Sequence, residues 1–186
     1  GKKYGAWGLT ENVSGSDAVA MASFAEKKGD KYILNGSKMF ITQGTVAGTY
    51  VITAVTEKTN GKNKISAFIL EPGTKGFRVG KKENKLGMRA SDTAELIFEN
   101  VEIPAENLIG VEHEGFKQVM KILDGGRIAI AALSLGLAQG ALDASIKYSK
   151  QRKQFGKTLS EFQATQFKLA EMQTDIEASR LLIYKA

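Results

Sequence analysis

The stretch Phe116-Lys-Gln-Val-Met-Lys-Ile-Leu123 marks the point at which the hydrophobic pattern of this chain changes. Its apolar residues lie at spacings of three, four and seven, which is typical of an amphipathic helix. From 128 to 146, apolar residues fall on almost every face of the expected helix, so neighbours should cover it on several sides. We expect Gly125-Gly126 to bend or break this helix, and Gly156 to cap its end.

Before this stretch the chain consists of short apolar segments separated by turn residues. The segments expected to be strands are 4–9, 22–26, 32–34, 38–42, 50–55, 65–71, 77–81 and 94–98. Asn35-Gly36 predicts a hairpin between the third and fourth of them, and the polar stretch 57–63 closes the fifth. No pattern of helical length lies between the segments to cross over a parallel sheet. An antiparallel sandwich or barrel is therefore expected.

A second helix is expected from Leu159 to the end of the chain. Ser160 and Gln163 have the spacing of a capping box. Its apolar stripe is formed by Phe162, Leu169, Met172, Ile176 and Ile183. Two helices with so much apolar surface require further helices from other sequence or other subunits. We therefore expect an α+β fold, with a β-domain over 1–108 and the first antiparallel long helices of an incomplete four-helix bundle over 109–186, in a fragment of a longer protein.

Composition narrows the possible functions. The chain has 186 residues, 42% hydrophobic and 25% charged, as in soluble globular proteins. No uninterrupted apolar run approaches the roughly 20 residues that span a bilayer, so no membrane association is expected. The absence of cysteine excludes disulfides and thiolate chemistry, and His113, the single histidine, is expected on a surface loop without metal partners. The net charge of +6 is dispersed, which favours phosphorylated small ligands over nucleic acid.

The first strand is followed by the polar stretch Trp7-Gly-Leu-Thr-Glu-Asn-Val-Ser-Gly-Ser-Asp17. Hydroxyls of Thr10, Ser14 and Ser16, with nearby N–H groups, could surround an oxygen-rich ligand, because glycine lets the main chain come close. The alternative is an ordinary polar turn, which local composition alone favours.

In order and spacing, these segments resemble the acyl-CoA dehydrogenase family, and most closely its short-chain, butyryl-CoA type. The resemblance covers the family's middle β-domain and the first part of its C-terminal helical domain. The motifs that carry it are Leu9-Thr-Glu with Gly15-Ser-Asp17, Lys38-Met-Phe-Ile-Thr42, Leu86-Gly-Met-Arg-Ala-Ser-Asp-Thr93, Asp124-Gly-Gly-Arg127 and Gln151-Arg-Lys-Gln-Phe-Gly156.

The resemblance implies FAD as the cofactor. Thr10 would meet the pyrimidine edge of the flavin, Phe40 would stack on it in place of the family's usual tryptophan, and Thr42 would reach its reactive nitrogen. Arg152 suits a phosphate of FAD in a neighbouring subunit, because a guanidinium offers paired donors. The implied FAD contacts are Trp7, Leu9, Thr10, Ser16, Phe40, Ile41, Thr42, Arg152, Gln154, Phe155, Phe162 and Gln163. Gln163 could equally serve as a helix cap.

The resemblance also implies a substrate path and a set of partners. Ser16 and the stretch Asp124, Gly125, Gly126 and Arg127 would border the acyl-CoA, although an intrahelical Asp124–Arg127 pair is an open alternative. The reaction would be α,β-dehydrogenation of a short-chain acyl-CoA to the trans-2-enoyl-CoA, with electron-transfer flavoprotein as the acceptor. A homodimer or homotetramer is implied, in the bacterial cytoplasm or, in a eukaryote, the mitochondrial matrix.

No residue of the chain is assigned as the catalytic base. In the isovaleryl and long-chain types the base immediately precedes the arginine matching Arg127, and here that position is Gly126. In the short- and medium-chain types it lies beyond the position of Ala186. We expect these 186 residues alone to bind FAD poorly or not at all and to be inactive. Two alternatives stay open: an acyl-CoA oxidase or nitroalkane-oxidase-like enzyme, and a non-catalytic flavin-binding or oligomerisation module, including one that binds DNA. Arg89 is expected to bond Asp92 or a main-chain carbonyl.

Overall fold

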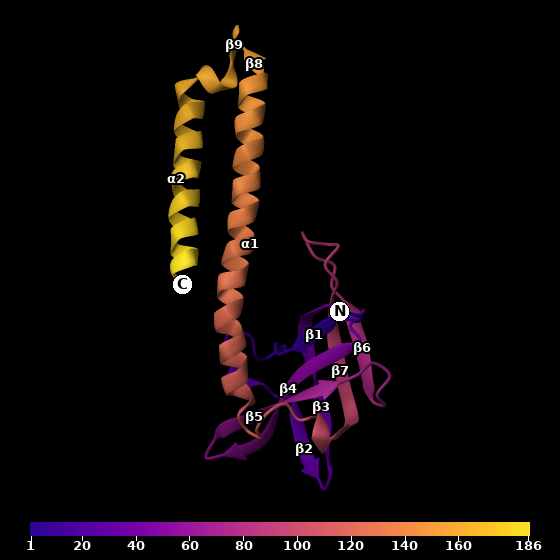
Figure 1. The fold of residues 1–186 in the computed structure, drawn as a ribbon. Helices are drawn as coiled ribbons and strands as arrows, with labels where there is room; N and C mark the ends of the chain where they lie inside the picture. Colours follow the sequence, from indigo (N-terminus) through magenta and orange to yellow (C-terminus); the bar gives the residue numbers. More distant parts are fainter. The chain divides into compact units, whose positions relative to one another are not determined.

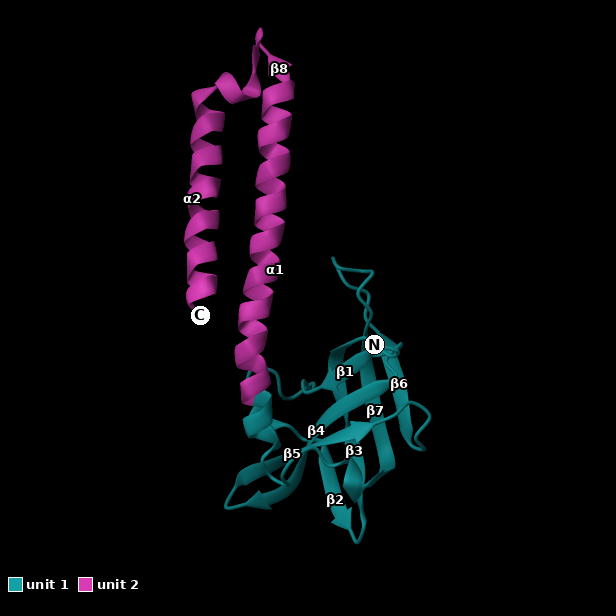
Figure 2. Cartoon of the chain, viewed as in Figure 1, with its two compact units in different colours: residues 1–119 teal, residues 120–186 magenta.

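The computed structural model describes residues 1–186 as two compact units, 1–119 and 120–186 (Figure 2). The first unit holds a seven-stranded mixed sheet, and the second holds most of one long helix and all of another (Figure 1). A sheet followed by two long helices confirms the predicted α+β class.

The strands of the sheet are β1 (Gly5–Gly8), β2 (Phe24–Lys28), β3 (Lys31–Thr42), β4 (Thr49–Thr59), β5 (Lys62–Leu70), β6 (Phe77–Lys82) and β7 (Thr93–Pro104). Their order is β1-β4-β2-β3-β7-β6, and β5 pairs with the free part of β4. Short 3₁₀ turns, η1 (Ala18–Ala20) and η2 (Ala105–Asn107), follow β1 and β7. The sheet is mixed rather than purely antiparallel, because β1 and β2 both pair with β4 in parallel.

Strand β3 runs through Asn35-Gly36 without reversing, so the hairpin predicted there is wrong. Gly36 has φ 138°, and a Cβ on it would lie 2.7 Å from the Cα of Ser23. The glycine therefore permits the close approach of the neighbouring segment, at a register shift between Leu34 and Gly36. The chain reverses earlier, at Gly29-Asp30, where β2 turns into β3.

The other Asn-Gly pair of the chain, Asn60-Gly61, does form a hairpin turn, between β4 and β5. Asn60 and Gly61 have φ 50° and 72°, the left-handed pair that a tight two-residue turn requires. The two strands reach further than the pattern suggested, because residues 57–59 pair with 62–64 across the turn.

The core of the first unit is built from alternating residues of β3, β4, β5 and β7. Its largest fully buried members are Tyr32, Leu34, Tyr50, Ile52, Phe68, Leu96, Phe98 and Ile103. The Tyr32 and Phe68 rings lie 4.8 Å apart, so β3 and β5, which are not neighbours in the sheet, are in aromatic contact. Ala6 on β1 and Ile41 near the end of β3 belong to the same core.

Helix α1 (Gly115–Gln151) is continuous, so no break occurs at Gly125-Gly126, the site where a bend or break was expected. In a helix of 37 residues the propensity cost of two glycines, about 2 kcal/mol, is spread over many main-chain hydrogen bonds. The helix ends at Gln151, and Gly156, with φ 79°, instead lies at the turn between β8 (Lys153–Gln154) and β9 (Lys157–Thr158). The predicted cap at Gly156 is therefore also wrong.

Helix α2 (Gln163–Lys185) follows the 3₁₀ turn η3 (Leu159–Glu161). The capping box is formed by Thr158 and Glu161, two residues earlier than predicted. Within the second unit α2 returns beside α1, and Arg180 donates a hydrogen bond of 2.7 Å to Gln139 Oε1 (Figure 1). The antiparallel arrangement of the helices is confirmed.

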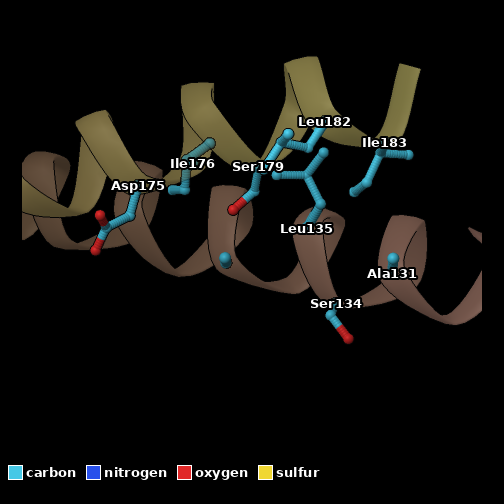
Figure 3. A pocket seen from close by; sticks show the side chains of 9 residues that line it. Ala131, Ser134, Leu135, Asp175, Ile176, Ser179, Leu182 and Ile183 are labelled. Carbon is cyan, nitrogen blue, oxygen red and sulfur yellow. The ribbon is translucent and has the colours of Figure 1, made fainter. Parts of the chain in front are cut away.

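Much of the apolar surface of these helices is exposed in this chain. Ile130 is 62% and Leu137 70% exposed on α1, and Leu181 is 69% exposed on α2. Between the helices lies an apolar hollow of about 470 Å³, into which Leu135, Ile176 and other side chains project (Figure 3). The helices thus retain the unpartnered faces that the sequence pattern predicted.

By length and composition alone, α1 is also apolar enough to cross a membrane, with a window of mean hydropathy 1.4. The sequence contains no uninterrupted apolar run of this length, because Ser134 and Gln139 lie within the stretch, but the mean over the window is still high. A single helix of this kind is weak evidence, since a core helix of a soluble protein meets the same criterion.

Candidate functional site

In the first unit, the polar loop after β1 meets the second half of β3. The main-chain N–H of Met39 donates to the carbonyl of Thr10 at 2.8 Å. Lys38 Nζ reaches the carbonyl of Leu9 at 3.1 Å. These hydrogen bonds join two motifs that lie some thirty residues apart in the sequence.

A β-bulge interrupts β3 at this junction. Lys38 pairs with Leu96 of β7 and Ile41 with Ala94, so β3 has one residue more than its partner. Phe40 takes φ 59° and leaves its ring 60% exposed. A bulge turns a side chain away from its place in the alternation. A left-handed backbone costs an L-residue roughly 1–2 kcal/mol, and such strain at an exposed aromatic side chain points to a functional role.

The residues flanking Phe40 have different surroundings. Ile41 is 3% exposed and belongs to the core, and its carbonyl accepts from the N–H of Gly44, so this residue is not open to a ligand in this chain. Thr42 is exposed at the end of β3. Trp7 on β1 is half-buried, as are Leu9 and Thr10 just beyond it. The structure therefore brings together Thr10, Phe40 and their neighbours, the candidates from the first two motifs.

A buried ion pair ties the two motifs together. Lys38 Nζ lies 2.7 Å from Glu11 Oε1, and the two side chains are 0% and 5% exposed. Glu11 also accepts hydrogen bonds from the main-chain N–H groups of Ala22, at 2.6 Å, and Ser23, at 3.1 Å. Sequence reasoning missed this pair, since neither residue is distinguishable from a surface charge by its local pattern.

Burial shifts the pKa values of Glu11 and Lys38 in opposite directions. Burial by itself raises the pKa of Glu11, but Lys38 and the N–H groups of Ala22 and Ser23 outweigh it and hold that pKa below its ordinary value. For Lys38, loss of hydration is the largest influence and lowers the pKa, with Glu11 opposing it.

The loop itself is a compact turn. Glu11 and Ser14 exchange main-chain hydrogen bonds of 2.8 and 3.2 Å, and Ser14 Oγ donates to the carbonyl of Asp17 at 2.6 Å. The polar turn is therefore present. The hydroxyls of Thr10 and Ser16 make no hydrogen bond within the chain, which leaves them available to a ligand.

In the second unit, the remaining cofactor candidates lie on and beside the β8–β9 hairpin. Phe155 is 93% exposed at the turn, with φ 52°, and its ring centroid lies 6.5 Å from that of Phe162. Lys157 Nζ lies 4.3 Å from the Phe162 ring. Arg152 and Gln154 are exposed on the hairpin, and Gln163 begins α2.

Three further expectations concern charged residues. Arg127 pairs with Asp124 at 2.6 Å on α1, so the intrahelical alternative is realised in this chain. Arg89 donates to the Lys85 carbonyl at 2.9 Å, which confirms the main-chain alternative for that residue. His113 lies on the loop before α1, half-exposed, with Nδ1 3.0 Å from the hydroxyl of Thr56. The structure has no cluster of side chains suited to a metal ion.

Comparison with known proteins explains why these motifs occur together. The family model of the acyl-CoA dehydrogenase middle domain matches residues 6–101, and that of the acyl-CoA dehydrogenase C-terminal domain matches residues 113–186. The chain belongs to the acyl-CoA dehydrogenase family. That family consists of flavoprotein oxidoreductases that use FAD.

Its similarity to individual family members is high. The short-chain-specific acyl-CoA dehydrogenase of Clostridium acetobutylicum is 53% identical over 186 residues, which are 100% of this chain and 49% of that protein. The structure of butyryl-CoA dehydrogenase from Megasphaera elsdenii matches with TM-score 0.94 at 53% identity, over 98% of this chain and 48% of that one. A chain in the structure of the electron transferring flavoprotein of Acidaminococcus fermentans matches with TM-score 0.94 at 58% identity, over 100% and 49%. The chain spans about half the length of the curated relatives it matches.

Proposed function

We propose that the protein carrying this chain is an FAD-dependent acyl-CoA dehydrogenase that converts a short-chain acyl-CoA into its trans-2-enoyl-CoA. Family membership and the short-chain relatives support this assignment. The observation that carries it is the junction of the Thr10 loop with the Phe40 bulge, because this is where the chain exposes a strained aromatic ring beside free hydroxyls.

The residues at this junction fit a flavin. Bound FAD would supply the hydride acceptor of the reaction. Phe40 offers an exposed ring face for stacking, and Thr10 and Thr42 offer hydroxyl donors to the heteroatoms of a flavin ring. Such donors stabilise negative charge that develops on an acceptor during reaction. Half-buried Trp7 and Leu9 complete this set, and the buried Ile41 follows Phe40 in the core.

The β8–β9 hairpin fits the other end of the cofactor. Its exposed Arg152 could bind a phosphate through two N–H groups at once. Phe155 and Phe162 form an aromatic surface beside it, with Gln154 and Gln163 as amide donors. We assign this hairpin to the FAD of a neighbouring subunit, in a homodimer or homotetramer. The exposed apolar faces of α1 and α2 support such an assembly.

For the substrate, Ser16 and the stretch from Asp124 to Arg127 are assigned to the acyl-CoA path. Gly125 and Gly126 have no side chain, so a thin chain could approach the main chain of α1 closely there. Gly126 has no side chain to remove a proton, so none of these residues is assigned as the catalytic base. Electron-transfer flavoprotein is the proposed acceptor, and the bacterial cytoplasm the proposed location.

The test uses the polypeptide in which these residues naturally occur. Purified protein should contain about one FAD per subunit, and anaerobic butyryl-CoA should bleach the flavin absorbance faster than octanoyl-CoA does. Electron-transfer flavoprotein should then restore the absorbance faster than oxygen. A protein that holds no flavin would contradict the assignment, and rapid reoxidation by oxygen would instead indicate an oxidase.

A further inference from the structure

The Glu11–Lys38 pair lies between the two motifs that make up the flavin-facing surface, but neither side chain is exposed on that surface. A buried ion pair is a poor way to gain stability, because the loss of hydration offsets most of the attraction between the charges. Apolar side chains of similar volume would hold the same core at least as well. The pair therefore calls for a role other than stability.

On the strand side, the pair fixes the residue that immediately precedes the bulge. Lys38 Nζ donates to Leu9 O and Glu11 Oε1, and the next residue, Met39, donates its N–H to Thr10 O. Three consecutive loop residues are thus held by two consecutive strand residues. The hydroxyl of Thr10 and the ring of Phe40 extend from the two segments that these contacts join.

On the loop side, the carboxylate of Glu11 closes the segment that contains Ser16. It accepts from the N–H groups of Ala22 and Ser23, eleven and twelve residues away along the chain. Both ends of the loop are therefore attached to one side chain. Gly8 allows the Lys38 stem to pack close, because a Cβ on Gly8 would lie 3.1 Å from Lys38 Cγ.

We propose that Glu11 and Lys38 are positioning residues, which set Thr10 against Phe40 and hold the Ser16 loop closed, and so shape the surface that receives the flavin. This inference rests on the proposed function. A misplacement of about 1 Å can weaken a preorganised site on the order of 100-fold, so removal of the pair should act on the flavin even where the fold survives.

The decisive variant removes both charges. Lys38→Met alone leaves a buried carboxylate without its cation, and this variant should unfold more easily. In Glu11→Gln/Lys38→Met the amide oxygen can still accept from Ala22 and Ser23, and no buried charge is left unpaired. Its resistance to urea should return to near that of the unchanged protein. Its affinity for FAD should not return, because the contacts to Leu9 O and the charged tie to the loop are lost.

The experiment titrates FAD into the apoprotein of the naturally occurring polypeptide and follows flavin fluorescence and the visible spectrum. We expect the dissociation constant for FAD to rise by roughly tenfold to 100-fold in the double variant, with an altered flavin band. Ile103→Ala, in the core on β7 opposite Tyr32 at the start of β3, is the control for lost stability. Lys31→Met, which breaks the exposed Lys31–Glu102 pair, is the control for lost charge. Both controls should keep the FAD dissociation constant within about twofold.

Hydrogen exchange in the apoprotein separates this inference from the proposed function. The double variant should exchange faster over 9–23 and 38–42, while 93–104 stays protected. A double variant with unchanged exchange and unchanged FAD affinity would overturn the positioning role even if the protein is a dehydrogenase. If the unchanged protein binds no flavin, the proposed function fails, and exchange over the two segments still decides whether the pair positions them.

Discussion

Position 40 allows a test in which alanine and glycine should reverse their usual order. Phe40 is held at φ 59° on the β3 bulge. Phe40→Ala and Phe40→Gly both remove the ring and its partial burial, so they differ only in the Cβ atom. The comparison therefore isolates the backbone strain at the bulge from the packing of the aromatic ring.

The expected difference follows from two opposing effects. A Cβ in the left-handed region costs roughly 1–2 kcal/mol, which Phe40→Gly relieves and Phe40→Ala retains. Glycine gains more freedom in the unfolded chain, which costs roughly 0.5–1 kcal/mol relative to alanine. The glycine variant should therefore be the more stable by about 0.5–1 kcal/mol. With a urea m-value of about 2 kcal/mol/M, its unfolding midpoint should be higher by about 0.3–0.5 M.

Urea denaturation followed through Trp7, the single tryptophan of the chain, measures this difference in the first unit. The neighbouring residue Met39 is the matched control, because it lies outside the left-handed region. There Met39→Ala should be more stable than Met39→Gly by the usual roughly 0.5–1 kcal/mol. If alanine is the more stable substitution at both positions, the bulge is not strained and the argument for a ligand at Phe40 loses its basis.

Three other outcomes are expected from single sites. Gly76→Ala should lower the free energy of unfolding by at least about 1–2 kcal/mol in urea denaturation, because φ is 84° and the added Cβ would collide with the carbonyl of Glu99. The free energy of unfolding of the unchanged protein should fall as pH decreases below about 4.3, the ordinary pKa of glutamate. The pKa of Glu11 is lowered in the folded state, so its contribution to stability is present at neutral pH and is lost when the carboxylate is protonated. In acid denaturation, Glu11→Gln/Lys38→Met should therefore show a flatter dependence of stability on pH. Arg127→Gln should change thermal stability by less than about 1 kcal/mol, because its ion pair is exposed.

The sequence predicted most of the strands and both helices. Short apolar segments bounded by turn residues located the strands, and the change of hydrophobic period near Phe116 located the first helix. Several of the errors occurred at glycines, because a glycine indicates only that the main chain has conformational freedom there. At Gly36 that freedom admits a neighbouring segment, and at Gly156 it turns a hairpin rather than ending a helix. Which of these two roles a glycine has depends on the segments that pack against it.

The sequence likewise predicted only some residues of the candidate site. Thr10, Phe40 and Thr42 were identified through the resemblance of their motifs, because residues that meet a ligand are constrained in type. Glu11 and Lys38 belong to the same motifs but were not identified, because a charged residue is expected to be exposed to solvent unless its partner is known. Lys38 is the last residue paired with β7 before the bulge, and its Nζ reaches the loop carbonyl of Leu9 at 3.1 Å. The buried pair and the strained Phe40 are thus adjacent on β3, and the burial of Lys38 depends on a loop some thirty residues away, so it could not be inferred from the strand alone.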